Sequence, residues 1–353
     1  MTNALNIVKT PVLVTGAAGF IGFHTSLRLL MEGRSVVGID NLNDYYDVTL
    51  KLDRLKQLDQ FSNFQFCKLD ISDRAAMENL CESKGPFTEV IHLAAQAGVR
   101  YSITNPYDYI TSNCMGHLTV LEMCRRTPHF KHLVYASSSS VYGSNKKLPY
   151  SVQDETNHPV SIYAATKRAD ELFSYSYAHL YKIPQSGLRF FTVYGPWGRP
   201  DMSPFIFADA ITTGKKLPVF NHGRMKRDFT YIDDIVTGIL AVLKLPPQDE
   251  VPQRVLNIGS THGEILIDFI RAIEKSIGLP ADLDFQDMQA GDVKDTCADM
   301  TETVALTGLK PSVSIREGVP RFIEWYKSYY KTSFPLSQMN ECFPVKHNRG
   351  LSR

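Results

Sequence analysis

A glycine-rich turn near the start of the chain constrains the fold more than any other feature. Residues 12–15 read as a strand that runs directly into Gly16, Gly19 and Gly22, and a helical pattern begins at residue 23. The first glycine permits the tight turn, the second lets the backbone approach a pyrophosphate, and the third lets the helix pack closely on the strand. The pattern therefore predicts a dinucleotide site, with the phosphates on the free N–H groups at the start of the helix.

A carboxylate marks the sugar end of this expected site. Asp40 closes a second apolar run, 35–39, where its oxygens can accept hydrogen bonds from both ribose hydroxyls of an adenosine. The carboxylate would repel a 2′-phosphate, so NAD is expected rather than NADP. No Gly-Lys-Ser or Gly-Lys-Thr ending follows the glycines, so a mononucleotide loop is not indicated. The alternative is a tight strand–helix turn that binds no ligand.

Short apolar runs alternate with helix-length segments through the first half of the chain. Besides the two runs already described, strands are expected at 64–69, 90–93, 132–136 and 185–190, with helices at 23–31, 113–125 and 163–180. This alternation is typical of βαβ units. It predicts an α/β fold, a Rossmann-type doubly wound parallel sheet with a smaller, interleaved α/β substrate-binding domain.

The pattern of expected elements changes at about residue 192. From there on the elements are shorter, and loops rich in Pro and Gly separate them. We therefore expect an NAD-binding domain at 10–191, with segments at about 231–260 that return to its sheet. Residues 192–230 and 261–330 should form the substrate-binding domain, and residues 331–353 a polar C-terminal tail.

The composition excludes several classes of function. Among 353 residues, 38 Lys and Arg balance 37 Asp and Glu, and the net charge of +1 gives no reason to expect a nucleic-acid partner. No apolar run approaches the roughly 20 residues that span a bilayer, and residues 1–10 lack the apolar core of a secretion signal. The six cysteines, at 67, 81, 114, 124, 297 and 342, are scattered, and no His or Cys cluster has metal-ligand spacing. We expect a cytoplasmic protein with reduced thiols, no bound metal and no membrane contact.

Hydroxyl and ammonium groups are placed where acid–base chemistry could occur. A run of four serines, 137–140, follows the fifth expected strand, and ligands of such sheets bind beyond the carboxyl ends of the strands. Tyr163 and Lys167 share one helix face at i and i+4. The lysine cation and a positive nicotinamide ring would favour the phenolate, making Tyr163 a general base and Lys167 its tuner and a ribose anchor. The alternatives are a chance pair on a helix and a serine-rich turn.

Together these features resemble the motifs of the extended short-chain dehydrogenase/reductase family, which includes nucleotide-sugar epimerases, dehydratases and decarboxylases. The resemblance runs from about residue 11 to residue 330, and it also covers Asp70-Ile71, His92-Leu93-Ala94-Ala95 and Val141-Tyr142-Gly143. Four segments resemble UDP-glucuronate 4-epimerases in particular, namely 40–47, 96–102, 195–202 and 227–234.

The resemblance implies a role for each matching residue. The catalytic set would be Tyr163, Lys167 and Ser138, with Ser139 and Ser140 as close rivals of Ser138. The residues implied to contact NAD are Gly16, Ala18, Gly19, Phe20, Ile21, Gly22, Asp40, Asn41, Asn43, Asp70, Ile71, Leu93, Ala94, Ala95, Gln96, Asn113, Tyr163 and Lys167. Those implied to contact the UDP-sugar are Arg100, Thr192, Arg199, Val219, Phe220, Arg227, Gln289 and Asp292. Within these sets Asp70 and Ile71 would bracket the adenine, 217–220 would cradle the uracil, and Arg227 would meet the diphosphate.

Two departures from the UDP-hexose epimerase pattern bear on the substrate. Gln289 stands where many of those enzymes carry a second phosphate-binding arginine, and Thr192 stands near the place of an asparagine beside the reactive sugar. The smaller hydroxyl suggests a different substituent at carbon 5. Arg199 offers a guanidinium fork that matches a carboxylate, while Arg100 is a competing carboxylate ligand or a phosphate contact.

The expected function is NAD-dependent 4-epimerisation of UDP-glucuronate to UDP-galacturonate through a 4-keto intermediate, for polysaccharide biosynthesis. The alternative is a UDP-N-acetylglucosamine or UDP-glucose 4-epimerase. Dehydratases and decarboxylases of the family carry acidic residues where this chain has serines 138–140, and a non-catalytic NAD sensor or RNA binder would not need an intact Tyr163/Lys167 pair. The resemblance also implies a homodimer paired through helices at 109–125 and 163–180, although one chain's own core could bury them.

Overall fold

The computed structural model describes residues 10–289 and 293–330. The expected polar tail at 331–353 and the expected substrate contact Asp292 therefore lie outside the described residues. Among the residues described, no helix combines the length and the apolar character needed to cross a membrane.

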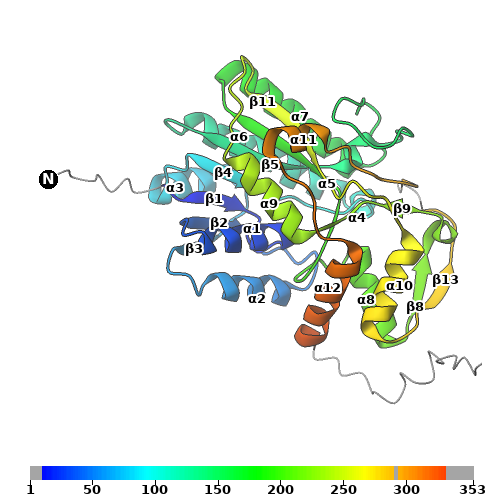
Figure 1. Cartoon of the computed structure of the whole chain (residues 1–353). Helices are drawn as coiled ribbons and strands as arrows, with labels where there is room; N and C mark the ends of the chain where they lie inside the picture. The colour runs from blue at the N-terminus through cyan, green and yellow to red at the C-terminus, as the bar shows by residue number, and fades with distance from the viewer. Residues whose placement is uncertain (1–9, 290–292, 331–353) are drawn as a thin grey trace, which may run out of the picture.

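A seven-stranded parallel sheet forms the centre of the molecule (Figure 1). Its order is β3-β2-β1-β4-β5-β6-β11, so the strand order reverses between β1 and β4, where doubly wound sheets bind their ligands. The strands are β1 (Val12–Thr15), β2 (Val36–Asp40), β3 (Phe64–Lys68), β4 (Glu89–His92), β5 (His132–Ser138), β6 (Gln185–Phe190) and β11 (Gln253–Ile258). The apolar runs predicted from the sequence are thus confirmed as strands of one sheet.

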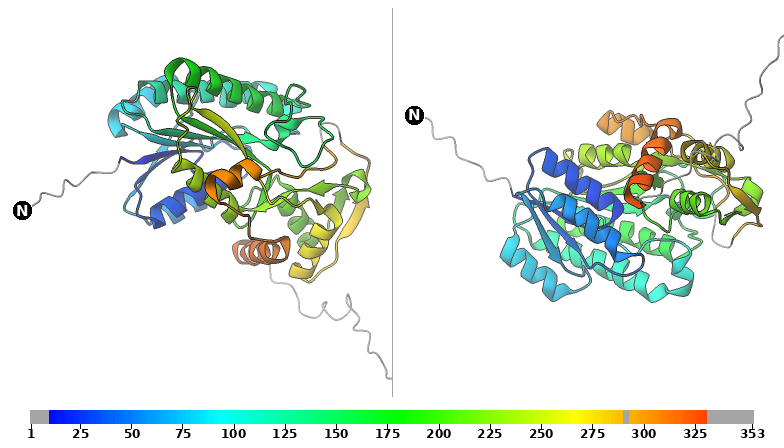
Figure 2. Two further views of the ribbon diagram at one scale, coloured as in Figure 1. Left: turned by 45° about the horizontal axis from the view of Figure 1, so that its top comes forward. Right: turned by 90° about the horizontal axis from the view of Figure 1, so that it is seen from below.

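Helices cover both faces of this sheet, which is why its strands are apolar on both sides (Figures 1 and 2). One face carries α1 (Phe20–Met31), α2 (Val48–Leu58) and α9 (Ile232–Leu243). The other carries α3 (Arg74–Lys84), α6 (Gly116–Arg126) and α7 (Ile162–Tyr181). Leading into α6 are the short helices α4 (Tyr101–Thr104) and α5 (Pro106–Tyr109) and the π-helical segment η1 (Ile110–Met115), so the helix expected at 113–125 begins in π geometry.

A smaller group of elements lies beyond the carboxyl ends of the strands (Figure 1). It contains α8 (Ser203–Thr213), α10 (Leu266–Ile277) and α12 (Ile315–Tyr330), with β8 (Lys216–Val219) paired in parallel with β13 (Asp282–Phe285). Two further small pairs join β7 (Thr192–Tyr194) to β10 (Phe229–Tyr231), and β9 (Lys226–Arg227) to β12 (Glu264–Ile265). The helix α11 (Thr301–Thr307) packs near β11.

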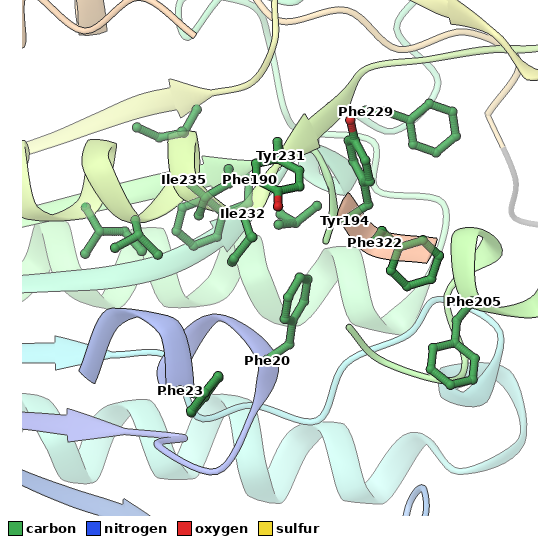
Figure 3. Packing of buried hydrophobic residues seen from close by; sticks show 14 of the residues in the cluster. Phe20, Phe23, Phe190, Tyr194, Phe205, Phe229, Tyr231, Ile232, Ile235 and Phe322 are labelled. Atoms are coloured by element: carbon green, nitrogen blue, oxygen red, sulfur yellow. The ribbon is translucent and has the colours of Figure 1, made fainter. Parts of the chain in front are cut away.

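One hydrophobic cluster joins the two groups of elements (Figure 3). Phe20 and Phe23 come from α1, Tyr194 and Phe229 from the β7–β10 pair, and Phe322 from α12, and all are buried. The rings of Phe229 and Phe269 stack at a centroid distance of 3.8 Å. This shared core holds the smaller group against the end of the sheet.

Candidate active site

A pocket of about 590 Å³ lies between the carboxyl ends of the strands and the smaller group of elements. The glycine turn, the ends of β2 and β4, the serine run and the start of α7 line one part of it. The segment around Thr192, the loop around Arg199 and residues from β8 to β9 line the other part. Segments far apart in the sequence thus line one pocket.

The glycine turn has no room for larger residues. Gly16 has φ +72°, and a Cβ there would lie 2.8 Å from the backbone nitrogen of Ala94. A Cβ on Gly22 would overlap the carbonyl oxygen of Gly16. No side chain caps the start of α1 at Gly19, and Phe20 and Ile21 of its first turn line the pocket. The turn therefore leaves helix-terminal N–H groups at the pocket wall, where they can receive a diphosphate.

Asp40 sits at the pocket wall at the end of β2. Its oxygens accept hydrogen bonds from the backbone N–H groups of Leu42 at 2.9 Å and Ala18 at 3.2 Å. Burial raises the pKa of this carboxyl group, and the neighbouring Lys51 acts in the opposite direction. Ala18, an expected cofactor contact, is fully buried behind the pocket and positions Asp40 through its backbone N–H.

Lys51 is a pocket residue that the sequence analysis missed. It lies on the buried side of α2, and its Nζ donates to the backbone carbonyl of Asn43 at 2.7 Å and to the Asn43 side chain at 2.6 Å. Its spacing from the buried Leu50, Leu55 and Leu58 places it on the apolar face of the helix. A cation on such a face is the signal that could have identified it.

At the far end of β3, Asp70 and Ile71 line the pocket as expected. Asp70 Oδ2 accepts a hydrogen bond from Asn41 Nδ2 at 2.9 Å, and Asp70 Oδ1 accepts one from Ser72 N at 2.9 Å. These bonds fix two of the expected adenosine-side residues relative to each other.

Tyr163, Lys167 and serines 138–140 all line the pocket. Ser161 caps α7 by accepting a hydrogen bond from Ala164 N at 3.1 Å, which places Tyr163 in the first turn of the helix. Lys167 Nζ donates to the carbonyl oxygen of Ala136 at 3.0 Å and to Asp170 Oδ2 at 3.3 Å. A phenol, an ammonium and several hydroxyls beside a dinucleotide cradle can together move a proton to and from a sugar hydroxyl.

Asn113 does not line the pocket but supports it from behind. Its side chain is buried in η1, where Oδ1 accepts from Gln96 N at 2.8 Å and Nδ2 donates to Gln96 O at 3.1 Å. Nδ2 also donates to Thr166 Oγ1 at 2.9 Å, on the helix turn that follows Tyr163. This amide therefore ties the loop after β4 to α7.

Most of the expected UDP-sugar residues also line the pocket, namely Arg100, Thr192, Arg199, Phe220 and Arg227. The Arg100 guanidinium lies over the Phe220 ring at 4.8 Å from its centroid. Val219 is instead buried, because side chains alternate along a strand and its neighbours Pro218 and Phe220 take the pocket side. Gln289 is not among the pocket residues.

The most informative contact at this end was not expected from the sequence. Arg199 forms an ion pair with Asp201, whose Oδ2 also accepts a hydrogen bond from Tyr45 Oη at 3.0 Å. Burial opposes the charge on the arginine, but the Asp201 carboxylate outweighs it and raises the pKa of the Arg199 guanidinium. Burial raises the pKa of the Tyr45 phenol to about 12, and the charge of Asp201 adds to this shift. Both tyrosine and arginine therefore keep their protons as hydrogen-bond donors near neutral pH.

Within residues 10–289 and 293–330, no group of three or more His, Cys, Asp or Glu residues could hold a metal. The cysteines in this part of the chain, Cys67, Cys81, Cys114, Cys124 and Cys297, are all free.

The chain is similar to known proteins over most of its length. The family model described as "NAD dependent epimerase/dehydratase family" matches residues 12–259. A "Probable UDP-glucuronate 4-epimerase" of Rhizobium meliloti (strain 1021) is 46% identical over 334 residues, covering 90% of this chain and 97% of the relative. UDP-glucuronate 4-epimerase 2 of Arabidopsis thaliana is 44% identical over 333 residues, covering 91% of this chain and 76% of the relative.

A solved structure is similar over nearly the same span. It is the UDP-glucuronic acid 4-epimerase of Bacillus cereus in complex with UDP-glucuronic acid and NAD. The TM-score is 0.84 with 35% sequence identity, and the match covers 91% of this chain and 100% of that chain.

Proposed function

The chain belongs to the NAD dependent epimerase/dehydratase family, and from that premise we propose that it is a UDP-sugar 4-epimerase whose substrate is UDP-glucuronate. The observation that carries the proposal is the meeting of Tyr163 and Lys167 with Thr192 and Arg199 in one pocket that also contains the glycine turn. The names of the similar proteins, which include several UDP-glucuronate 4-epimerases, support the same substrate.

The residues present fit NAD. The crowded glycine turn gives a diphosphate access to the start of α1, and the Asp40 carboxylate lies where an adenosine ribose would follow. When bound, NAD supplies a reversible hydride acceptor at carbon 4 of the sugar. Asp40, Asn41, Asp70 and Ile71 would hold the adenosine half, and Lys167 would hold the nicotinamide ribose.

In the proposed reaction Tyr163 acts as the acid–base residue. Its phenolate accepts the proton of the carbon-4 hydroxyl, and a hydroxyl of the serine run holds the sugar oxygen in line. The resulting 4-keto sugar turns about its diphosphate link and presents its opposite face. Tyr163 then returns the proton to the oxygen at carbon 4, so the residue ends the cycle in its starting state.

The carboxylate of glucuronate makes an extra demand on the site. The 4-keto form of this sugar is a β-keto acid, which readily loses carbon dioxide. Thr192 and Arg199 would hold the carboxylate in an orientation that disfavours this loss. No acidic residue stands among serines 138–140, so the site offers no general acid there for the elimination that a dehydratase catalyses. A UDP-N-acetylglucosamine or UDP-glucose 4-epimerase is the second candidate. It would be favoured if Arg199 binds only Asp201 and no substrate carboxylate.

The division into an NAD-binding domain and a substrate-binding domain stays a prediction.

We further propose that the protein is a cytoplasmic homodimer that pairs through η1, α6 and α7. Ile110, Leu172 and Phe173 are 52%, 51% and 37% exposed, as a partner surface requires. Leu121, which lies in the helix range expected to pair, is instead fully buried in the core of its own chain. Tyr107, Met115 and Leu180 are further exposed apolar residues on α5, η1 and α7.

The experiment that tests the function is direct. Purified protein is incubated separately with UDP-glucuronate, UDP-glucose and UDP-N-acetylglucosamine, and the products are identified by NMR. Formation of UDP-galacturonate as the fastest reaction supports the proposal. Faster conversion of either neutral sugar would favour the second candidate instead.

A further inference from the structure

A buried carboxyl group that the proposed reaction does not use lies against Lys167. Asp170 follows Lys167 by three residues on α7, and the side chains of the two are only 2% and 4% exposed. Asp170 Oδ2 accepts a hydrogen bond from Lys167 Nζ at 3.3 Å, while the carbonyl of Ala136 accepts a second at 3.0 Å. An ammonium has three N–H donors, so these bonds leave one to point into the pocket that Lys167 lines.

The second carboxyl oxygen of Asp170 lacks a comparable hydrogen bond among the described residues. Oδ1 is buried and has no hydrogen-bond partner among the described residues. An ionised carboxylate in such a place is costly. Burial accordingly raises the pKa of Asp170 to about 7, although the charge of Lys167 acts in the opposite direction. The carboxyl group therefore changes its charge close to neutral pH.

The other titratable groups that face Asp170 are neutral or already paired. Lys167 is therefore the opposite charge that acts on Asp170. On α7 itself, Glu171 carries a like charge but is held by Arg189 at 2.8 Å. From η1 and α6 come Cys114 and His117, and burial keeps both neutral by raising the pKa of the thiol to about 11 and lowering that of the imidazole. From β5 comes Tyr135, whose pKa burial also raises.

We propose that Asp170 is a positioning residue for the Tyr163–Lys167 pair. Its carboxyl group fixes the direction of the Lys167 ammonium, and its ionised form offsets the positive charge that favours the Tyr163 phenolate. The proposal rests on the acid–base role proposed for Tyr163. It predicts that the three residues work as one unit, so that the charge of Asp170 influences the pH dependence of turnover.

The pairing can be tested without any substrate by carbon NMR of protein labelled at the aspartate carboxyl carbons. The signal that disappears in Asp170→Asn belongs to Asp170, and Asp170→Ser identifies the same signal if the first variant does not fold. In Lys167→Met this signal should titrate about one pH unit or more higher, because the cation that favours the carboxylate is gone. An unchanged midpoint in Lys167→Met would overturn the proposal.

The effect on the reaction is tested by the pH profile of kcat. In Asp170→Asn the acid limb should move to lower pH by about 0.5 unit, because nothing offsets the ammonium charge any longer. Asp154→Asn is the matched control, since it removes the same charge from the surface pair with Lys147 and should leave the profile in place. Coincident profiles of Asp170→Asn and the wild type would overturn the proposal. Absence of wild-type turnover on every UDP-sugar would instead refute the proposed function, and the NMR titration would still decide the pairing.

Discussion

Arg199 and Asp201 face each other in a bidentate ion pair at the wall of the pocket. Arg199 Nε lies 3.0 Å from Asp201 Oδ1, and Arg199 Nη2 lies 2.5 Å from Asp201 Oδ2. The arginine thus already holds one carboxylate in the geometry in which it would hold another. A substrate carboxylate must either bind the remaining edge of the guanidinium or take the place of Asp201.

Replacement of Arg199 by alanine should therefore discriminate between acidic and neutral sugars. Loss of a charged hydrogen-bond partner typically costs about 1.5–3 kcal/mol, or a factor of roughly 10 to 150 in kcat/KM. We expect this loss with UDP-glucuronate, while any activity on UDP-glucose stays unchanged or improves. UDP-4-keto-pentose should also appear in the product NMR spectrum, because the β-keto acid would be held less firmly.

Arg227→Ala is the control for this prediction, because a diphosphate contact should lower kcat/KM equally for all UDP-sugars. If Arg199→Ala shows the same uniform loss, Arg199 serves the diphosphate or the structure of the loop. Arg100, which also lines the pocket, would then be the better candidate for the carboxylate.

Tyr163→Phe should lower turnover sharply without unfolding the protein. The substitution keeps the ring, which packs edge-on to Tyr109 at a centroid distance of 6.1 Å, and removes only the hydroxyl. Removal of a general base typically lowers the rate by roughly 100-fold or more. Steady-state kinetics measure the loss, and the melting temperature checks the fold. Turnover close to that of the wild type would show that another group is the base.

Asp40 should determine the choice of cofactor. We expect the protein to purify with bound NAD or NADH, and Asp40→Ala to weaken NAD binding far more than NADP binding. The physical reason is the loss of a hydrogen-bond acceptor for the ribose hydroxyls together with the loss of repulsion toward a 2′-phosphate. Titration calorimetry on protein freed of cofactor measures both affinities. Tighter binding of NADP than of NAD by the wild type would contradict the assignment.

How far the site could be predicted depends on whether a residue's role is local in the sequence. The glycine turn and Asp40 are set by a strand, a turn and a helix start, so their pattern can be recognised without a structure. Tyr163 and Lys167 are likewise related by one helical turn. By contrast, Tyr45 meets Asp201 across 156 positions of the sequence, and no local pattern connects them. Val219 and Phe220 show a further limit, because the phase of a short strand decides which of two neighbours faces the ligand.

The proposed dimer should depend on side chains that the fold leaves exposed. Light scattering at micromolar concentration should give twice the mass of one chain. Leu172→Glu places a charge on the exposed side of α7, where the side chain is 51% exposed, and should produce monomers that keep their melting profile. Leu52→Glu is a suitable control, because Leu52 is 43% exposed on α2, away from the proposed interface. A monomeric wild type would contradict the proposal.

Buried histidines should make the protein unstable in mild acid. Burial lowers the pKa of His92 from 6.5 to about 3, and that of His24 and His132 from 6.5 to about 4. At His132 burial outweighs the bond from Nδ1 to the carbonyl of Leu243 at 3.0 Å, which acts to raise the pKa, and Nε2 lies 2.9 Å from Ser186 Oγ. Arg254, which donates to the same serine oxygen, adds to the lowering.

The sign of the effect follows from which state binds the proton. Because burial lowers the pKa of these histidines in the folded protein, the unfolded chain takes up protons first as the pH falls. Their contribution to the free energy of unfolding is therefore fully present above about pH 6.5 and is lost as the pH falls toward the folded pKa. Each such histidine contributes a slope of about 1.4 kcal/mol per pH unit between its two pKa values. Denaturant unfolding between about pH 7.5 and about pH 4.5 measures the total slope. His132→Gln can keep a polar contact but cannot become charged. It should therefore lower that slope by the contribution of one histidine, about 1.4 kcal/mol per pH unit. An unchanged slope in this variant would mean that the His132 site admits the proton before the protein unfolds.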